Sequence, residues 1–237
     1  MAFDASKKAA AEAAVKFVEP DMVVGLGTGS TSLHMVRLLS ERVAQGLRVE
    51  AVATSEAIAA EARRLGIVLV ADYPNFQRVD VTLDGADEVD EEGRLIKGGG
   101  GALLREKLVA TASTRLVIMI DESKRVKCLG QNWPIPVEIV PFGWARLQKR
   151  IEELGAKVQL RLHEGRPFVT DQNNYIFDCN FGPMADPEKV HAQLIQLTGV
   201  VETGLFLGLT NTLVIGAEDG TARVQHFYPA PPNYVRA

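Results

Sequence analysis

The stretch MVVGLGTGSTSLHMVRLLSERV, residues 22–43, decides the fold. It begins with a short apolar run, Met22–Leu26, passes through a glycine-rich segment and continues from Ser32 to Val43 with the periodicity of a helix. A strand, a glycine-rich turn and a helix in this order are typical of a parallel α/β sheet.

Strands and helices alternate on both sides of this stretch. Before it, apolar residues at helical spacing predict a helix over residues 6–18, which Pro20 ends. After it, strands are expected at 47–53, 67–70, 79–83 and 116–120, with helices at 55–65 and 102–111. Buried strands that alternate with helices predict a doubly wound, Rossmann-like α/β sheet.

A different order of elements follows the segment 130–136, in which Gly and two Pro residues interrupt both periodicities. Strands expected at 137–140, 157–162, 175–179 and 200–203, with helices at 144–154 and 187–198, give the order β-α-β-β-α-β of a ferredoxin-like module. Segments 212–217 and 221–227 predict a hairpin that returns to the first domain, and residues 227–237 predict an extended tail. We therefore expect a Rossmann-like main domain of residues 1–130 and 207–237, with a smaller ferredoxin-like α+β lid domain of residues 131–206 inserted into it.

The composition excludes several classes of protein. The 237 residues include 26 Lys and Arg against 30 Asp and Glu, and the formal charge of −4 is spread along the chain, so a nucleic-acid partner is not expected. No apolar run approaches the roughly 20 residues that span a bilayer. Charged residues also interrupt the segment 1–17, so a signal peptide is not expected. We expect a cytoplasmic protein without a membrane partner.

Cysteines and histidines lack the spacing of metal ligands. Cys128 and Cys179 are far apart and form no CxxC pattern, so free thiols in a reducing compartment are expected. The four histidines share no HxxxH spacing. The sequence therefore predicts neither a metal site nor a cofactor.

The glycine-rich turn GLGTGST, residues 25–31, suits an anion. Backbone N–H groups and the positive end of the following helix dipole face such a turn, and the hydroxyls of Thr28, Ser30 and Thr31 add donors. The spacing matches neither the dinucleotide pattern GxGxxG nor the P-loop pattern. A plain turn followed by a Ser or Thr N-cap explains the same residues.

Two carboxylates follow the strand that ends near Leu83. Asp84 and Asp87, in DVTLDGADEVD (80–90), are expected at the carboxyl end of a parallel sheet, where such folds hold ligands. An Asx turn with solvated acids is the alternative. The neighbouring acids Glu88, Asp90, Glu91 and Glu92 are expected on the solvated surface.

The segment LIKGGGGALLREKL, residues 95–108, contains four consecutive glycines, Gly98–Gly101, which implies that another group comes close to that backbone. On a helical wheel, Glu106 falls within the apolar arc that includes Leu103 and Val109. A carboxylate in apolar surroundings is a stronger base near neutral pH, whereas the alternative is an exposed Glu in an Arg-Glu-Lys patch. Lys97 is a candidate cation at the same end of the sheet.

Seven segments together resemble the ribose-5-phosphate isomerase A family over nearly the whole chain: GLGTGST, DVTLDGADEVD, IKGGGGALLREK, DESK, PVEIVPFG, TDQNNYIFDC and GVVETGLF. The resemblance implies interconversion of ribose 5-phosphate and ribulose 5-phosphate, without a metal, in the non-oxidative branch of the pentose phosphate pathway. It also implies a homo-oligomer, a dimer or a tetramer.

The resemblance assigns roles to residues of this chain. Glu106 is then the base that moves a proton through a cis-enediolate, Asp84 assists ring opening, and Asp87 with Lys97 handles hydroxyl protons and developing charge. Backbone N–H groups of Gly98, Gly99, Gly100 and Gly101 serve the enediolate oxygen. The phosphate is assigned to Ser30, Thr31 and the neighbouring Gly29, with charge from Lys7 and Lys124 and with Thr28 on the sugar; Lys8 adjoins Lys7 and is an alternative to it.

The chain departs from the family pattern at two places. It has a fourth glycine, Gly101, where the family commonly reads GGGA, and it reads TDQNN at residues 170–174 where the family reads TDNGN.

The alternative functions are a sugar-phosphate deaminase, a coenzyme A transferase and a non-catalytic effector-binding domain of a transcriptional regulator. The first two need acid and histidine motifs that the sequence lacks. The third does not need Asp84, Asp87 and Glu106, and the sequence offers no basic helix-turn-helix segment for it.

Overall fold

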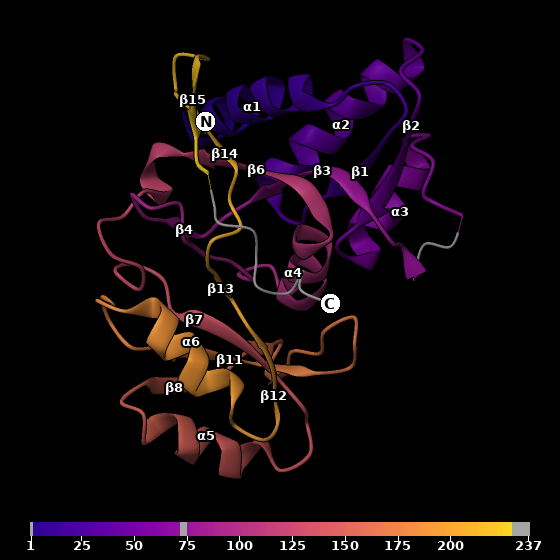
Figure 1. Ribbon diagram of the computed structural model, residues 1–237. Helices are drawn as coiled ribbons and strands as arrows, with labels where there is room; N and C mark the ends of the chain where they lie inside the picture. Colours follow the sequence, from indigo (N-terminus) through magenta and orange to yellow (C-terminus); the bar gives the residue numbers. More distant parts are fainter. Residues whose placement is uncertain (1, 72–74, 229–237) are drawn as a thin grey trace. The chain divides into compact units, whose positions relative to one another are not determined.

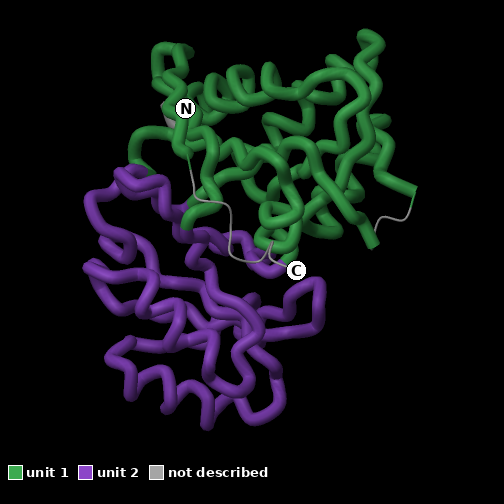
Figure 2. The backbone as a smooth tube through the Cα atoms, in the orientation of Figure 1, with its two compact units in different colours: residues 1–86, 105–124, 208–237 green, residues 87–104, 125–207 purple. Residues whose placement is uncertain are grey.

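The fold is described from a computed structural model, which describes residues 2–71 and 75–228 (Figure 1). It divides the chain into two compact units, coloured separately in Figure 2. Unit 1 contains residues 1–86, 105–124 and 208–237, and unit 2 contains residues 87–104 and 125–207. Most of the expected tail, residues 229–237, lies outside the described residues.

Unit 1 is built on a six-stranded sheet with the order β15-β14-β6-β3-β1-β2 (Figure 1). Its strands are β1 (Met22–Leu26), β2 (Val49–Ala53), β3 (Val79–Gly85), β6 (Ser113–Asp121), β14 (Thr212–Gly216) and β15 (Ala222–His226). All neighbours are parallel except the hairpin of β14 with β15. The predicted Rossmann-like sheet is therefore confirmed, with one antiparallel strand at its edge.

The helices of unit 1 are α1 (Ala2–Ala14) with the short η1 (Val15–Phe17), α2 (Ser30–Ala44), α3 (Glu56–Arg64), the crossover helix α4 (Leu103–Thr111), which begins in unit 2, and η3 (Glu122–Lys124). Small residues let α1 pack tightly on the sheet, since Ala10 and Ala14 are fully buried. A Cβ atom on Gly216 of β14 would lie only 1.9 Å from the Ser6 carbonyl oxygen. The backbone of α1 can therefore lie against β14 because residue 216 has no side chain.

Unit 2 contains a four-stranded antiparallel sheet with the order β12-β7-β11-β8. Its strands are β7 (Ile135–Ile139), β8 (Lys157–Leu160), β11 (Tyr175–Asn180) and β12 (Val200–Thr203), and its helices are α5 (Trp144–Glu152) and α6 (Pro187–Ile195). Asp186 caps α6 by accepting a hydrogen bond from the Lys189 N–H at 2.9 Å. The order β-α-β-β-α-β confirms the predicted ferredoxin-like module.

Five short strands were not expected from the sequence. β4 (Glu88–Val89), β5 (Leu95–Ile96) and β13 (Leu205–Phe206) form a three-stranded sheet in unit 2, and β9 (Leu162–His163) pairs with β10 (Arg166–Pro167). The expected strand at 67–70 is reduced to a single bridge between Ala51 and Leu69.

The unit boundaries differ from the expected domain boundaries in one respect. Residues 87–104, 125–130 and 207 belong to unit 2, although the sequence had placed them in the main domain. The reason is pairing: Ile96 of β5 lies opposite Leu205 of β13, and the Val126 N–H donates to the Val89 carbonyl at 2.9 Å.

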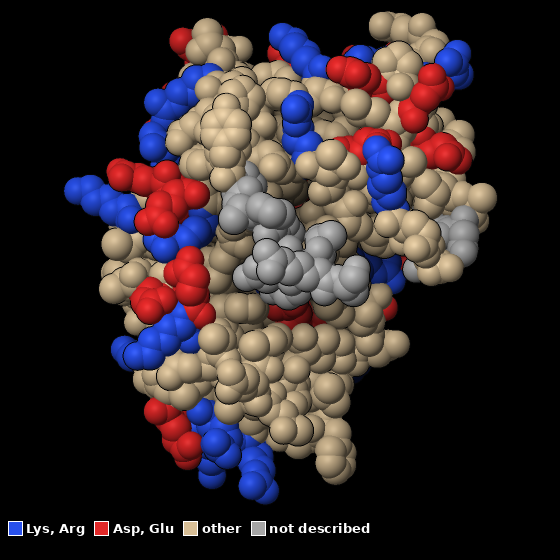
Figure 3. Space-filling view, viewed as in Figure 1, with Lys and Arg blue, Asp and Glu red and all other residues tan. Residues whose placement is uncertain are grey.

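The described residues contain no helix that is both long and apolar enough to cross a membrane. Basic and acidic side chains are interspersed on the face drawn in Figure 3 and do not separate into patches of one sign. This face offers no basic surface of the kind that nucleic-acid binding requires.

Candidate active site

The glycine-rich turn of unit 1 connects the end of β1 to the start of α2. Gly29, at the N-cap of α2, has a φ of 125°, which a residue with a Cβ rarely adopts. The Gly27 N–H donates to the Leu83 carbonyl at 2.9 Å, which ties the turn to the end of β3. The Thr28 hydroxyl lies 2.7 Å from Thr54 Oγ1, so Thr28 is part of a hydroxyl network at the ends of β1 and β2.

A lysine of α1 lies at this turn. The Lys7 ammonium donates to the Ser30 hydroxyl at 2.9 Å, whereas Lys8 forms an ion pair with Glu12 at 3.7 Å. Lys7 is therefore the residue of the pair that joins the turn. Lys124 ends η3, directly after β6, the strand on the other side of β3 from β1, and it is half-buried.

Asp84 lies at the carboxyl end of β3 with an exposed fraction of 1%. Its Oδ1 atom accepts the Gly85 N–H at 2.7 Å. A Cβ atom on Gly27 would lie 2.0 Å from this same oxygen and 2.6 Å from the Asp84 Cα atom. The absence of a side chain at residue 27 therefore lets the carboxylate lie directly against the glycine-rich turn.

Glu106 lies on α4 and is 2% exposed. The helix packs on the sheet, since a Cβ atom on Gly25 of β1 would lie 2.8 Å from the Val109 side chain. Glu106 precedes Val109 by one helical turn and faces the same side. A crossover helix runs back along parallel strands, so Glu106 lies nearer than Val109 to the carboxyl ends, where Gly27 and Asp84 also lie. The alternative of an exposed Glu106 is wrong.

In unit 2, Asp87 directly precedes β4 and Lys97 directly follows β5, the strand that pairs with β4. The Asp87 N–H donates to the Ile96 carbonyl at 2.8 Å, and its carboxylate accepts the Gly99 N–H at 2.8 Å. Lys97 is only 2% exposed, and its ammonium lies 5.5 Å from the centre of the Phe206 ring. A buried ammonium over an aromatic face is stabilised by a cation–π contact.

The four glycines form a compact turn before α4. Gly98 and Gly101 have φ angles of 99° and 84°, and the Gly101 N–H donates to the Gly98 carbonyl at 2.9 Å. A Cβ atom on Gly101 would lie 2.4 Å from the Phe168 ring, so the glycine that departs from the family pattern is required by both its backbone conformation and its neighbour.

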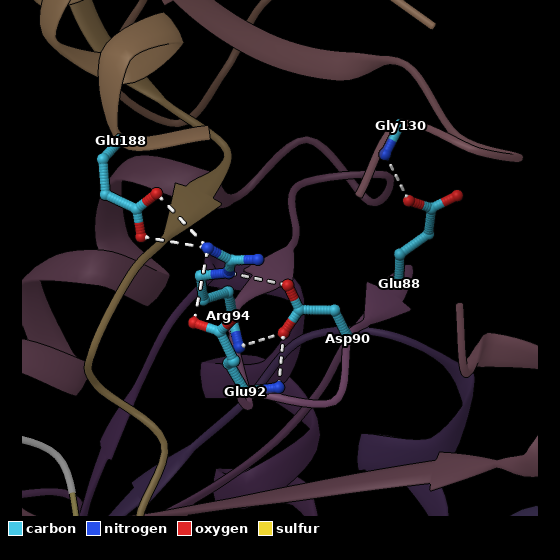
Figure 4. Close-up of polar contacts among 6 residues, drawn as sticks. All are labelled: Glu88, Asp90, Glu92, Arg94, Gly130 and Glu188. Carbon is cyan, nitrogen blue, oxygen red and sulfur yellow. Dashed lines mark hydrogen bonds and ion pairs between the residues drawn. The ribbon is translucent and has the colours of Figure 1, made fainter. Parts of the chain in front are cut away.

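Two acids that the sequence placed on the surface are buried. Glu88 is 1% exposed and accepts backbone N–H groups of Gly130, Asn132 and Trp133 at 2.6, 2.5 and 2.8 Å. Asp90 is 3% exposed and binds Arg94 at 2.7 Å, while Arg94 also contacts Glu92 and Glu188 (Figure 4). The expectation of solvated acids is wrong for Glu88 and Asp90, because each has several donors that replace water.

Glu138 is a further buried acid, which the sequence analysis did not identify. It lies in β7, is 1% exposed and accepts hydrogen bonds at 2.9 Å from both the Thr170 hydroxyl and the Asn174 amide. Burial raises the pKa of Glu138, and the hydrogen bonds from Asn174, Thr170 and the Leu104 N–H oppose that increase. Through Leu104 this carboxylate binds the first turn of α4, two residues before Glu106. The sequence contains one indication of this buried acid, because Glu138 is the single carboxylate within the apolar run 135–139.

Within residues 2–71 and 75–228, the other reactive groups do not form a second site. Among the described residues, no three His, Cys, Asp or Glu side chains come together in a way that could hold a metal ion. Cys179 is fully buried, and burial raises the pKa of its thiol, which leaves it protonated and unreactive.

Comparison with known proteins identifies the family. Residues 50–220 match the family model described as ribose 5-phosphate isomerase A (phosphoriboisomerase A). This chain belongs to the ribose-5-phosphate isomerase A family. The enzyme of that name from Gloeobacter violaceus is 50% identical over 221 residues, which cover 93% of this chain and 96% of the relative. The Parvibaculum lavamentivorans enzyme is 48% identical over 225 residues, with 92% and 96% coverage.

Solved structures of ribose 5-phosphate isomerases have the same fold. The Plasmodium falciparum isomerase superposes with a TM-score of 0.88 at 37% identity, covering 94% of this chain and 98% of that one. The Methanocaldococcus jannaschii isomerase A superposes with a TM-score of 0.86 at 35% identity, again with 94% and 98% coverage. A further isomerase, solved with phospho-erythronic acid, has a TM-score of 0.88 at 34% identity, with 93% and 97% coverage. The resemblance stated from the sequence is confirmed.

Proposed function

We propose that this isomerase interconverts D-ribose 5-phosphate and D-ribulose 5-phosphate by moving one proton between C1 and C2 through a cis-enediolate, with Glu106 as the base. The observation that supports the assignment of the base is the burial of Glu106 on α4, the crossover helix between β3, which holds Asp84, and β6. A carboxylate that is removed from water favours accepting a proton, and a single base on one face of the enediolate suffices for both transfers.

The remaining roles follow from charge and hydrogen-bonding capacity. Asp84 assists ring opening by accepting the proton of the anomeric hydroxyl and returning it to the ring oxygen as the bond between C1 and that oxygen breaks. Asp87 and Lys97 handle the hydroxyl protons and the charge that develops on the enediolate oxygen. Backbone N–H groups of the glycine turn 98–101 stabilise the same charge. These steps require acid–base groups and donors and do not require a metal.

The phosphate is assigned to the glycine-rich turn at the start of α2. Helix N-termini and glycine-rich turns bind phosphate through backbone N–H groups, here from Gly29 onward, aided by the hydroxyls of Ser30 and Thr31. The hydrogen bond from Lys7 to Ser30, at 2.9 Å, supports a cation at this position. Lys124 supplies the second charge, and Thr28 contacts the sugar.

The test of the base is the Glu106→Gln variant, assayed for ribulose 5-phosphate formation from ribose 5-phosphate in the presence of EDTA. General-base catalysis contributes roughly 10²–10⁴-fold, so kcat is expected to fall about 10³-fold. Binding of phospho-erythronic acid, measured by calorimetry, is expected to persist. Glu41→Gln, on the exposed surface of α2, is the matched control and should retain full activity.

These assays distinguish an isomerase that uses Glu106 as its base from an isomerase with another base and from a non-catalytic effector-binding domain. A Glu106→Gln enzyme with near-normal turnover would remove the base from the mechanism. Folded wild-type protein that binds the sugar phosphate but forms no product, with or without divalent metal, would instead support an effector-binding domain.

We also propose that the enzyme works as a homo-oligomer, a dimer or a tetramer, in the cytoplasm. The proposal rests on family membership and on the absence of a membrane-spanning helix among the described residues. Light scattering on the purified protein tests it, and a monomer at assay concentrations would exclude the oligomer.

A further inference from the structure

Arg161 follows β8 in unit 2 and lies against the glycine turn. Its Nη1 atom donates to the carbonyl oxygens of Gly98, at 2.8 Å, and Gly99, at 3.2 Å. The other edge of the guanidinium binds Asp178, with Nε 3.0 Å from Oδ2 and Nη2 on Oδ1. The planar guanidinium is thus held by a bidentate carboxylate and directs its remaining donor at two successive peptide groups.

The backbone of Arg161 is also fixed. Its N–H donates to the Ile176 carbonyl at 2.8 Å, and its carbonyl accepts the Phe168 N–H at 2.9 Å. The side chain is 15% exposed. Contacts within unit 2 therefore fix both the backbone position of Arg161 and the plane of its guanidinium, without any ligand.

The contacts of Arg161 determine how the peptide groups of the turn point. In a planar trans peptide, the C=O and the following N–H point in opposite directions. The Gly98–Gly99 peptide is held at both ends, because its carbonyl binds Arg161 and its N–H binds Asp87 at 2.8 Å. The Gly99–Gly100 peptide also turns its carbonyl to Arg161. The Gly100 N–H must therefore point away from the guanidinium.

Gly100 differs from its neighbours in exposure and in the use of its N–H. The Gly99 N–H serves Asp87, and the Gly101 N–H serves the Gly98 carbonyl at 2.9 Å. Gly100 is exposed, whereas Gly98 and Gly101 are buried. Of these three donors, the Gly100 N–H is the one that belongs to an exposed residue and points away from Arg161.

A turn of glycines needs such a restraint. Glycine adopts positive and negative φ with similar ease, so a peptide group between two glycines reverses its direction at little cost. Reversal of the Gly99–Gly100 peptide would replace an N–H donor by a carbonyl oxygen. A carbonyl dipole directed at a developing negative charge repels it, whereas an N–H stabilises it.

We propose that Arg161 is a positioning residue for the isomerase reaction: by binding the carbonyls of Gly98 and Gly99, it directs the Gly100 N–H toward the oxygen that becomes negative in the enediolate. Arg161 itself does not touch the sugar. This inference rests on the role proposed above for the glycine turn, and it identifies which N–H of the turn carries that role and what holds it.

The test compares Arg161→Met with wild-type enzyme. Removing one donor from an oxyanion costs about 10²–10³-fold in kcat, and here the donor is released rather than removed, so kcat should fall at least about tenfold. KM for ribose 5-phosphate should stay within about threefold, because the phosphate is bound by other residues. Inhibition by phospho-erythronic acid, which carries a carboxylate, should weaken at least about fivefold, whereas inhibition by inorganic phosphate should stay within about twofold.

Arg94→Met is the matched control. Arg94 is an arginine of the same unit with a similar exposure of 18%. Its side chain binds the carboxylates of Asp90, Glu92 and Glu188 and not the glycine turn (Figure 4). It should lose stability without losing kcat. If Arg161→Met does not fold, Arg161→Lys is measured in its place, since lysine keeps the charge beside Asp178 but lacks the fork, and the same loss of kcat is expected.

Two results would overturn the proposal. One is a folded Arg161 variant with kcat within about twofold of wild type. The other is an equal loss of kcat in the Arg161 and Arg94 variants, which would show a general effect on unit 2. Both results require an active wild-type enzyme, so they are distinct from failure of the proposed reaction, in which wild type itself would form no ribulose 5-phosphate.

Discussion

Replacing Gly27 by alanine should move Asp84 and thereby reduce both stability and turnover. The new methyl group would lie 2.0 Å from Asp84 Oδ1 and 2.6 Å from its Cα atom. Non-bonded carbon atoms prefer about 3.5–4.0 Å, so a rotation of the Asp84 side chain is not enough and the backbone must move by about 1 Å. The Gly27 N–H is bonded to the Leu83 carbonyl at 2.9 Å, which prevents the turn from simply swinging away.

The magnitude follows from two opposing terms. Overpacking costs about 1–3 kcal/mol, and the lower entropy of the unfolded alanine chain returns about 0.4–1 kcal/mol, so the free energy of unfolding should fall by about 1–2 kcal/mol. For a protein of this size, each kcal/mol lowers Tm by about 2–4 °C. A displacement of about 1 Å in a reacting group costs on the order of 10²-fold in kcat.

The assay combines thermal unfolding with steady-state kinetics on Gly27→Ala and on Gly85→Ala. Gly85 is the matched control for stability, since its Cβ atom would meet nothing closer than the Met119 carbonyl at 3.8 Å and its φ is not positive. The control should keep its Tm within about 1–2 °C, as expected for a substitution without steric conflict. A Gly27→Ala enzyme with unchanged Tm and kcat would refute the claim that the contact with residue 27 fixes Asp84.

Two further predictions concern charged groups. Because the pKa of Glu138 is raised in the folded state, its contribution to stability is present at low pH and is lost as the pH rises from the ordinary glutamate value of 4.5 through the raised value. Glu138→Gln should therefore lose less Tm than wild type between pH 5 and pH 8, and identical pH profiles would contradict this sign. Lys7→Ala should raise KM for ribose 5-phosphate about tenfold, the loss expected for one charged hydrogen bond, whereas Lys8→Ala should change it less than twofold; equal effects in the two variants would reject the assignment of Lys7.

The periodic parts of the fold were predictable from the sequence. Continuous apolar runs such as 116–120 and helical repeats such as 144–154 match β6 and α5, because burial of a long regular element imposes its period on the sequence. Strands of two residues, such as β4 and β13, carry no period at all. The position of β13 depends on its pairing with β5, more than 100 residues earlier in the chain, and β4 is defined only by its pairing with the same short strand; local pattern records neither pairing.

The same distinction applies to the candidate site. Glu106 was predictable because the buried arc of its helix, with Leu103 and Val109, is visible on a helical wheel. Arg161 was not, since an arginine beside a short strand is usually solvated and only the fold brings it to Gly98. Glu138 lay between the two cases: one acid in a buried strand was visible, but its partners come from residues 104, 170 and 174.

The close packing of α1 against β14 has a consequence for biosynthesis. Ser6 and Gly216, which meet across this interface, are about 210 positions apart, so at a translation rate of roughly 5–20 residues per second the amphipathic first helix waits on the order of 10–40 s for its docking strand to emerge. During that interval α1 can pack on α2 and β6, which are made earlier, but the part of its alanine-rich face that meets β14 stays uncovered.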